Sequence, residues 1–150
     1  MVIKTLTVLM VFLMCGAQVT AVRAAETLHF NNDISRSSFE RIKSYVSNDL
    51  GQNIATHDIA KIDLNNDGLY EFILRPSGCD QGAKCNFIVL AESGSKIRPL
   101  GRFEGINLLL GTEFSHGIRN LLVFNSVVND FDYNLYTWHP KASAYRKSGS

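Results

Sequence analysis

The segment at residues 63–71, DLNNDGLYE, carries oxygen-bearing side chains at alternate positions, which is the pattern of a cation-binding loop. Calcium takes about six to eight oxygen ligands, and alternate residues of a tight loop can direct their oxygens toward one centre. Gly68, at the sixth position, permits the sharp turn that such a loop requires. The candidate ligands are Asp63, Asn65, Asp67, Glu71 and the backbone carbonyl of Leu69. They predict a structural Ca²⁺ site, because close carboxylates repel one another unless a cation lies between them.

The same residues also fit a hairpin turn that binds no metal. Asp67-Gly68 favours the left-handed backbone of a type I′ turn, and Asp63 or Asn65 can cap such a turn with a side-chain hydrogen bond. An EF-hand is excluded, because its twelfth position is a glutamate, whereas Leu74 occupies that position here within an apolar strand. A cation loop between two strands and a bare turn therefore remain as the two interpretations.

The pattern D-x-N-x-D-G-x-x-E between two predicted strands resembles the calcium loops of the integrin-type propeller repeats, the FG-GAP and VCBS group. The usual last ligand of those loops is an aspartate, and Glu71 stands in its place. The chain has one copy of the pattern, so a propeller is not implied. The wider layout resembles small exported bacterial proteins of uncharacterised function, through the segments DLNNDGLYEFIL, GCDQGAKC, GIRNLLVF and YNLYTW. This resemblance implies a fold and a compartment rather than an activity.

The first 24 residues have the features of a secretory signal peptide. Lys4 supplies a short positive start, a largely apolar uncharged run follows, and residues 22–24 offer small side chains at the −3 and −1 positions of a cleavage site. A membrane anchor is the alternative, but the run is shorter than the ~20 residues that span a bilayer. Bulky residues before Cys15 argue against a lipid anchor. We therefore predict a periplasmic or secreted protein with a single domain at residues 25–150.

The net charge of the predicted mature chain is close to zero. Removal of the signal peptide takes away Lys4 and Arg23 and no acidic residue, so 13 basic residues face 14 acidic ones, a net charge of about −1. No basic stripe is visible along the sequence. Nucleic acid and, after signal cleavage, membrane surfaces are therefore not expected as partners.

Two cysteines, Cys79 and Cys85, lie within the predicted mature chain. In an oxidising compartment two cysteines most simply pair with each other, and their C-x5-C spacing is not that of a redox motif. A metal-thiolate site is the alternative, but it would need further ligands nearby. We predict a Cys79–Cys85 disulfide that closes a polar hairpin.

The sequence shows none of the usual catalytic motifs. It contains no H-E-x-x-H, no G-x-S-x-G, no P-loop and no dinucleotide fingerprint. The histidines are too dispersed to suggest a ligand pair: His29, His57, His116 and His139. We therefore predict that the protein is not an enzyme.

Aromatic residues gather near the C-terminus, and most of them are expected in the core. Along the predicted strand at residues 131–138, alternation places Tyr136 and Trp138 on the face opposite Phe131 and Tyr133. If that face is exposed, Tyr136 and Trp138 form a candidate binding surface, since tyrosine and tryptophan dominate interface energetics.

One helix and several strands are expected to position these residues. Residues 37–50 show one apolar stripe at helical spacing, with Ser37 as a candidate N-cap, Glu40 completing a capping box and Gly51 at the C-terminal end. Short apolar runs separated by turn residues follow, whereas residues 25–36 are unpatterned and predict a loosely held arm. The expected fold is α+β, with one N-terminal helix packed on an antiparallel β-meander of five to seven strands.

These features predict an exported, non-enzymatic, calcium-stabilised domain that binds another periplasmic protein. An inhibitor or immunity protein for a periplasmic enzyme would suit the size and the compartment. The alternatives are a structural or accessory calcium-binding domain without a dedicated target, and an enzyme whose site is scattered along the sequence.

Overall fold

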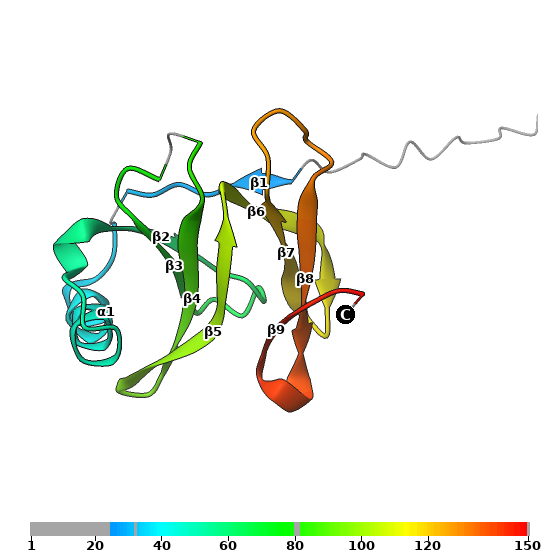
Figure 1. Ribbon diagram of the computed structural model, residues 1–150. Coiled ribbons are helices and arrows are strands. Elements are labelled where there is room, and N and C mark those ends of the chain that lie inside the picture. The colour runs from blue at the N-terminus through cyan, green and yellow to red at the C-terminus, as the bar shows by residue number, and fades with distance from the viewer. Residues whose placement is uncertain (1–24, 32, 80–81, 150) are drawn as a thin grey trace, which may run out of the picture.

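The computed structural model describes residues 25–31, 33–79 and 82–149, so the predicted signal peptide at residues 1–24 lies outside the described residues. The described chain contains one α-helix and nine strands (Figure 1). Their bounds are α1 Arg36–Asp49, β1 Glu26–Thr27, β2 His57–Ile62, β3 Glu71–Pro76, β4 Cys85–Ser93, β5 Lys96–Gly105, β6 Asn107–Ser115, β7 Ile118–Phe124, β8 Tyr133–His139 and β9 Ala144–Lys147. Two short 3₁₀ helices, Ile54–Thr56 and Pro140–Ala142, precede β2 and β9.

The strands form two antiparallel sheets rather than the single predicted meander. One sheet has the order β2-β3-β4-β5 and the other has the order β1-β6-β7-β8-β9. The chain passes from the first sheet to the second at Gly105, where a Cβ atom would lie 2.5 Å from Val123 Cγ1 and 2.7 Å from the Phe124 carbonyl oxygen. The predicted α+β class is confirmed, but the prediction of one sheet with five to seven strands is wrong, because strand patterning does not show where a meander changes sheet.

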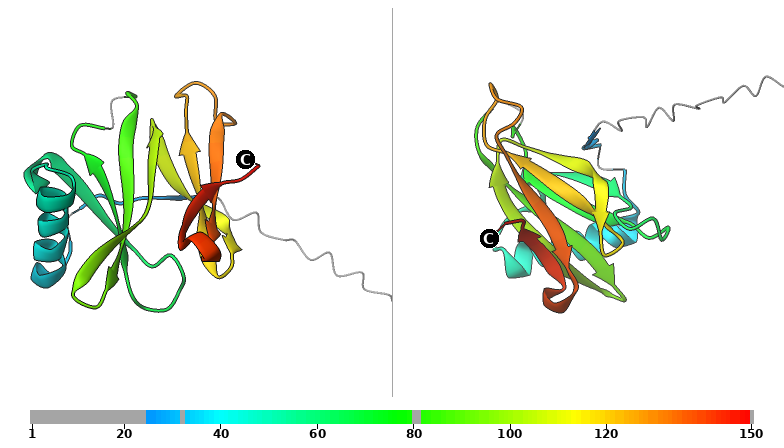
Figure 2. Two further views of the ribbon diagram at one scale, coloured as in Figure 1. Left: turned by 60° about the horizontal axis from the view of Figure 1, so that its bottom comes forward. Right: turned by 90° about the vertical axis from the view of Figure 1, so that its right-hand side faces the viewer.

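Three layers lie side by side: α1, the β2–β5 sheet and the sheet of β1 and β6–β9 (Figures 1 and 2). Strand β3 shows why the middle layer is apolar on both faces. Phe72 and Leu74 pack in a cluster with the helix residues Ile42 and Val46, whereas Ile73 points the other way into the core between the sheets. Side chains alternate along a strand, so an uninterrupted apolar run is what a covered central sheet requires.

The predicted helix is confirmed, but its N-cap is Ser35 rather than Ser37. Ser35 Oγ accepts a hydrogen bond from the Ser38 N–H at 3.1 Å, which satisfies one of the donors left free in the first turn. At the other end Gly51 adopts a positive φ of 63°, and the Gln52 N–H donates to the Val46 carbonyl at 3.0 Å.

Replacing Ser35 by alanine is expected to lower the free energy of unfolding by about 1 kcal/mol, because the Ser38 N–H loses its side-chain acceptor. Ser37→Ala is the matched control and should change stability by less than about 0.5 kcal/mol. Urea denaturation followed by far-UV circular dichroism measures both variants. An equal loss in the two variants would contradict this assignment of the cap.

The N-terminal arm is ordered and links the two sheets, in contrast to the predicted loose arm. Its strand β1 pairs with β6, with Glu26 opposite Leu110, and further along the arm Phe30 forms a bridge to Ala60 of β2. Between these contacts Leu28 is only 8% exposed and joins the core between the sheets. The arm therefore closes one side of the space between the sheets, while β5 and β9 contact each other on the other side.

Candidate functional site

The predicted cation loop, residues 63–70, joins β2 to β3 and packs against the second sheet. Its anchor is Leu64, whose side chain is 1% exposed within the core between the sheets. The backbone of Leu64 is held as well, because its carbonyl accepts a hydrogen bond of 2.8 Å from the Arg119 N–H of β7. The reversal of the chain depends on positive φ angles at Asn66 and Gly68, 58° and 82°. The core thus fixes one end of the loop, and the turn brings its polar residues together.

Asp63 organises the backbone of the loop. Its Oδ1 accepts hydrogen bonds from the N–H groups of Asn65, at 3.3 Å, and Asp67, at 3.2 Å. Its Oδ2 accepts a bond of 2.9 Å from the Gly68 N–H. A carboxylate that accepts several backbone N–H groups fixes the curvature of the chain around itself. The loop therefore has a defined shape before any ligand is considered.

Asp67 and Asn65 complete this network. Asp67 Oδ1 accepts from the Leu69 N–H at 2.7 Å, and its Oδ2 accepts from Asn65 Nδ2 at 2.8 Å. Asn65 Oδ1 accepts from the Asp67 N–H at 3.2 Å. The Leu69 side chain points outward and is 70% exposed. The Asx hydrogen bonds expected for a polar turn are therefore present in this structure.

Glu71, the first residue of β3, connects the loop to the protein interior. Its Oε2 accepts a hydrogen bond of 2.9 Å from the Leu64 N–H. Burial raises the pKa of Glu71 above its ordinary value, and the negative charges of Asp67 and Asp63 raise it further, whereas the Leu64 hydrogen bond lowers it. The pKa of Tyr145 in β9 is also raised, by burial first and then by the charge of Glu71. Burial and the two nearby aspartates therefore both disfavour the charged form of Glu71.

Three of the predicted calcium ligands lie together, but their oxygens already accept hydrogen bonds from the loop. Asp63, Asn65 and Asp67 lie on one turn, and each carboxylate oxygen has more than one lone pair available. In this structure, however, they accept backbone N–H groups, and no three acidic, histidine or cysteine side chains of the described residues form a preformed metal group. Binding would require the Asn65 side chain to turn, because its Nδ2 now faces Asp67. A cation site at this loop stays a prediction.

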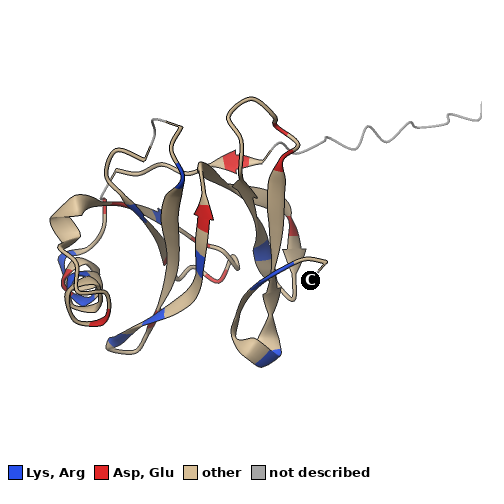
Figure 3. Ribbon diagram, in the orientation of Figure 1, with Lys and Arg blue, Asp and Glu red and all other residues tan. Residues whose placement is uncertain are grey.

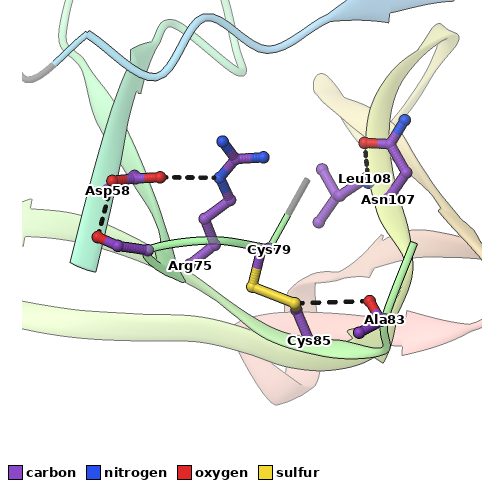
Figure 4. Close-up of a disulfide and its surroundings, with 8 residues drawn as sticks. Asp58, Arg75, Cys79, Ala83, Cys85, Asn107 and Leu108 are labelled. Carbon is purple, nitrogen blue, oxygen red and sulfur yellow. Dashed lines mark hydrogen bonds and ion pairs between the residues drawn. A yellow bond between two sulfur atoms is a disulfide. The ribbon is translucent and has the colours of Figure 1, made fainter. Parts of the chain in front are cut away.

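The cysteine pair forms a disulfide that links the hairpin ends of β3 and β4. Cys79 and Cys85 are bonded, with 5.8 Å between their Cα atoms, as predicted from the sequence (Figure 4). Nearby, Arg75 lies 3.3 Å from Asp58 Oδ2 and stacks over the Phe30 ring at 4.0 Å. Cys79 and Arg75 line a cavity of about 530 Å³ at this end of the molecule. The disulfide therefore braces one wall of an open cavity.

The two residues of the predicted aromatic surface are turned toward the core. The Tyr136 ring packs against Phe103 with a centroid distance of 4.5 Å, and the Trp138 ring packs against Tyr145 at 5.7 Å. Both are partly buried against the core between the sheets. The exposed aromatic residues in this part of the chain are Tyr133, the first residue of β8, which is 42% exposed, and Phe131, which precedes the strand and is 90% exposed. Periodicity separates two faces and does not show which one is covered.

The four histidines lie on separate parts of the described chain. His29 is in the N-terminal arm, His57 begins β2, His116 is in the turn between β6 and β7, and His139 ends β8. The structure does not bring them into one group with acidic residues or cysteines among the described residues. The absence of enzymatic activity stays a prediction.

Comparisons with known proteins found no match to this chain among family models, curated proteins or solved structures. Among the described residues, no helix has both the length and the apolar character needed to cross a membrane.

Proposed function

We propose that this chain is an exported, calcium-stabilised domain whose role is to bind another protein. The observation that carries the calcium proposal is the position of Glu71 beside Asp63 and Asp67. Burial raises the pKa of the Glu71 carboxyl, and the charges of those two aspartates raise it further, so a bound cation would relieve a repulsion among these groups. Asp63, Asn65, Asp67, Glu71 and the Leu69 carbonyl would hold the ion.

A bound Ca²⁺ would act as a structural tie rather than as a reagent. Asp63 and Glu71 flank Leu64, whose side chain fills the core and whose carbonyl is bonded to β7. Neutralising these carboxylates would stabilise the junction between the two sheets. The expected affinity is that of extracellular calcium modules, with Kd in the range of about 10⁻⁴ to 10⁻³ M.

The binding role is supported by exposed apolar side chains in the loop between β7 and β8. Val128 and Phe131, in the segment between β7 and β8, are each 90% exposed. Apolar side chains that gather at the surface without entering a core are typical of interaction sites. A structural domain without a dedicated target is the alternative, and the role of inhibitor for a periplasmic enzyme stays a prediction within the binding class.

The test of the calcium site is thermal unfolding of the protein, expressed from its full-length coding sequence, in chelator and in 5 mM Ca²⁺. The wild-type melting temperature is expected to rise by at least about 3–6 °C with calcium, because a Kd of about 10⁻³ M gives about 1 kcal/mol and a Kd of about 10⁻⁴ M gives about 2 kcal/mol. Magnesium at the same concentration controls for ionic strength and should give a smaller rise. A shift of the same size with both ions, or no shift with either, would leave the loop as a turn that binds no metal.

Glu71→Gln is expected to change stability in opposite directions in chelator and in calcium. In chelator the variant is expected to be more stable than the wild type, because the glutamine amide can still accept from the Leu64 N–H while the buried charge beside the two aspartates is removed. In calcium the order should reverse, because a charged ligand is lost. The matched control is Glu113→Gln, an exposed acid in β6 that should change nothing in either condition. A variant that is less stable by the same amount in both conditions would contradict the cation site.

A further inference from the structure

The segment joining β7 to β8, residues 125–132, turns its apolar side chains outward while polar side chains hold it in shape. The Asn125 N–H donates to the Asp132 carbonyl at 2.9 Å, and Asn125 Nδ2 donates to Asp132 Oδ1 at 3.0 Å. Asn129 Oδ1 accepts from the Phe131 N–H at 3.0 Å, and Ser126 Oγ accepts from the Val128 N–H at 3.2 Å. These hydrogen bonds define the conformation of the loop.

The outward side chains define a candidate surface, which we call the 127–133 patch: Val127, Val128, Phe131 and Tyr133, which are 66%, 90%, 90% and 42% exposed. Tyr133 is held by its ring contact with Phe124, with 5.4 Å between the ring centroids. Exposing large apolar side chains to water gives no folding free energy, so their arrangement on a braced loop points to contact with another molecule.

A cavity of about 530 Å³ opens beside the patch and can receive a side chain. Its apolar lining comes from Ile106, Leu109, Phe124 and Val127 together with Cys79 of the disulfide. The two loops that border it touch each other, since a Cβ atom on Gly82 would lie 3.3 Å from Val127 Cγ1. Figure 1 shows these loops rising at the same end of the molecule.

The charges around the cavity indicate the sign of the charge that a bound partner would carry. Asp130 lines the cavity, and the described residues give it no ion pair. Arg75 also lines the cavity, but its charge is engaged by Asp58 and by the Phe30 ring. Figure 3 shows acidic positions and no basic ones on the loop between β7 and β8. An uncompensated acid next to an apolar cavity is complementary to an apolar group flanked by a cation.

We propose that the 127–133 patch and its cavity dock a protein segment that presents an apolar side chain between lysine or arginine residues. The apolar side chain enters the cavity, and a basic group beside it pairs with Asp130, which lines the cavity. This inference rests on the proposed binding role and names the chemistry of the partner. An anionic membrane is the less suitable occupant, because Asp130 would face like charge at the lipid surface.

The test is an NMR titration of the ¹⁵N-labelled protein, expressed from its full-length coding sequence, with two nine-residue peptides. In one peptide leucine and phenylalanine alternate with lysine, and in the other the lysines are replaced by glutamates. Saturable shifts are expected with the basic peptide, centred on the amides of Ile106, Phe124 and Val127, and no saturable shifts with the acidic peptide. The variant Asp130→Asn should weaken binding about fivefold, since an exposed ion pair contributes up to about 1 kcal/mol.

Two further variants separate docking from loss of structure. Phe131→Ser removes an outward side chain and should weaken binding while the melting temperature stays within about 2 °C of the wild type. Asp49→Asn changes an equivalent charge at the end of α1 and should leave peptide binding unchanged. Equal affinity for both peptides, or no saturable shift with either, would overturn the proposed partner chemistry.

Two controls identify other occupants, each of which would also overturn the proposal. Sedimentation analysis tests for a dimer that is lost in Phe131→Ser, which would make the occupant a second copy of this chain. Co-sedimentation with vesicles of phosphatidylcholine and phosphatidylglycerol tests for a Phe131-dependent membrane contact. Failure of the peptide titration together with a retained calcium shift would remove this inference and leave the cation loop intact.

Discussion

Asp63→Ala is expected to lower the free energy of unfolding by about 2–3 kcal/mol in chelator, which is the larger of the loop effects. The substitution removes the acceptor of three backbone N–H groups, those of Asn65, Asp67 and Gly68. Charge-assisted hydrogen bonds contribute about 1.5–3 kcal/mol each when buried, but water can replace part of them in this half-exposed loop. In calcium the loss should grow by about 1 kcal/mol, because cation binding to the folded state also disappears.

Denaturant unfolding of wild type and Asp63→Ala, in chelator and in calcium, measures both parts of this prediction. Asp63→Asn is the matched control: it keeps one side-chain acceptor but loses the charge, so we expect a smaller loss in chelator and no calcium response. If Asp63→Ala were as stable as the wild type in chelator, the carboxylate would not organise the turn. If it kept the full calcium response, Asp63 would not be a ligand.

Leu28→Ala is expected to destabilise the protein by about 2–4 kcal/mol, although the residue lies only a few positions from the start of the described chain. Its side chain is 8% exposed and packs in the core between the two sheets, so truncation loses apolar burial and leaves a cavity. The arm on either side is held by pairing to β6 and by the Phe30–Ala60 bridge, which limits collapse around the missing atoms.

Leu69→Ala is the control for this prediction, because it makes the same chemical change at a side chain that is 70% exposed. We expect that change to cost less than about 0.5 kcal/mol. Both variants are compared with the wild type by urea denaturation followed by fluorescence of the single tryptophan, Trp138. Equal stability of Leu28→Ala and Leu69→Ala would mean that the arm does not contribute to the core in solution.

Local features of this fold were predictable from the sequence. Which of several neighbouring residues of the same type takes a structural role was not predictable. The apolar stripe of the helix, the disulfide and the polar turn at residues 63–71 depend on short-range patterns, and all three are present. The N-cap was missed because serines at positions 35, 37 and 38 satisfy the same preference. The arm was missed because its strand pairing involves only Glu26 and Thr27, too short a run for any periodicity.

Long-range features were beyond the sequence pattern for a physical reason. The exposure of Tyr136 and Trp138 depends on which face of β8 meets the other sheet, and that is decided by contacts with Phe103 and Tyr145. The change of sheet at Gly105 depends on the close approach of Val123. The outward 127–133 patch could have been suspected from two valines and a phenylalanine within a polar loop, but only the structure shows that they do not turn inward.

The arm also determines when the fold can close. Glu26 forms an ion pair of 2.6 Å with Arg119, a residue 93 positions further along the chain. Contacts of such high sequence separation carry a large loop-closure cost and form late in folding. A chain emerging N-terminus first must therefore present the arm long before its docking strands exist. Until they arrive, β1 has no partner strand and the apolar side chain of Leu28 has no core to enter, so this interval is when the arm is most exposed to aggregation.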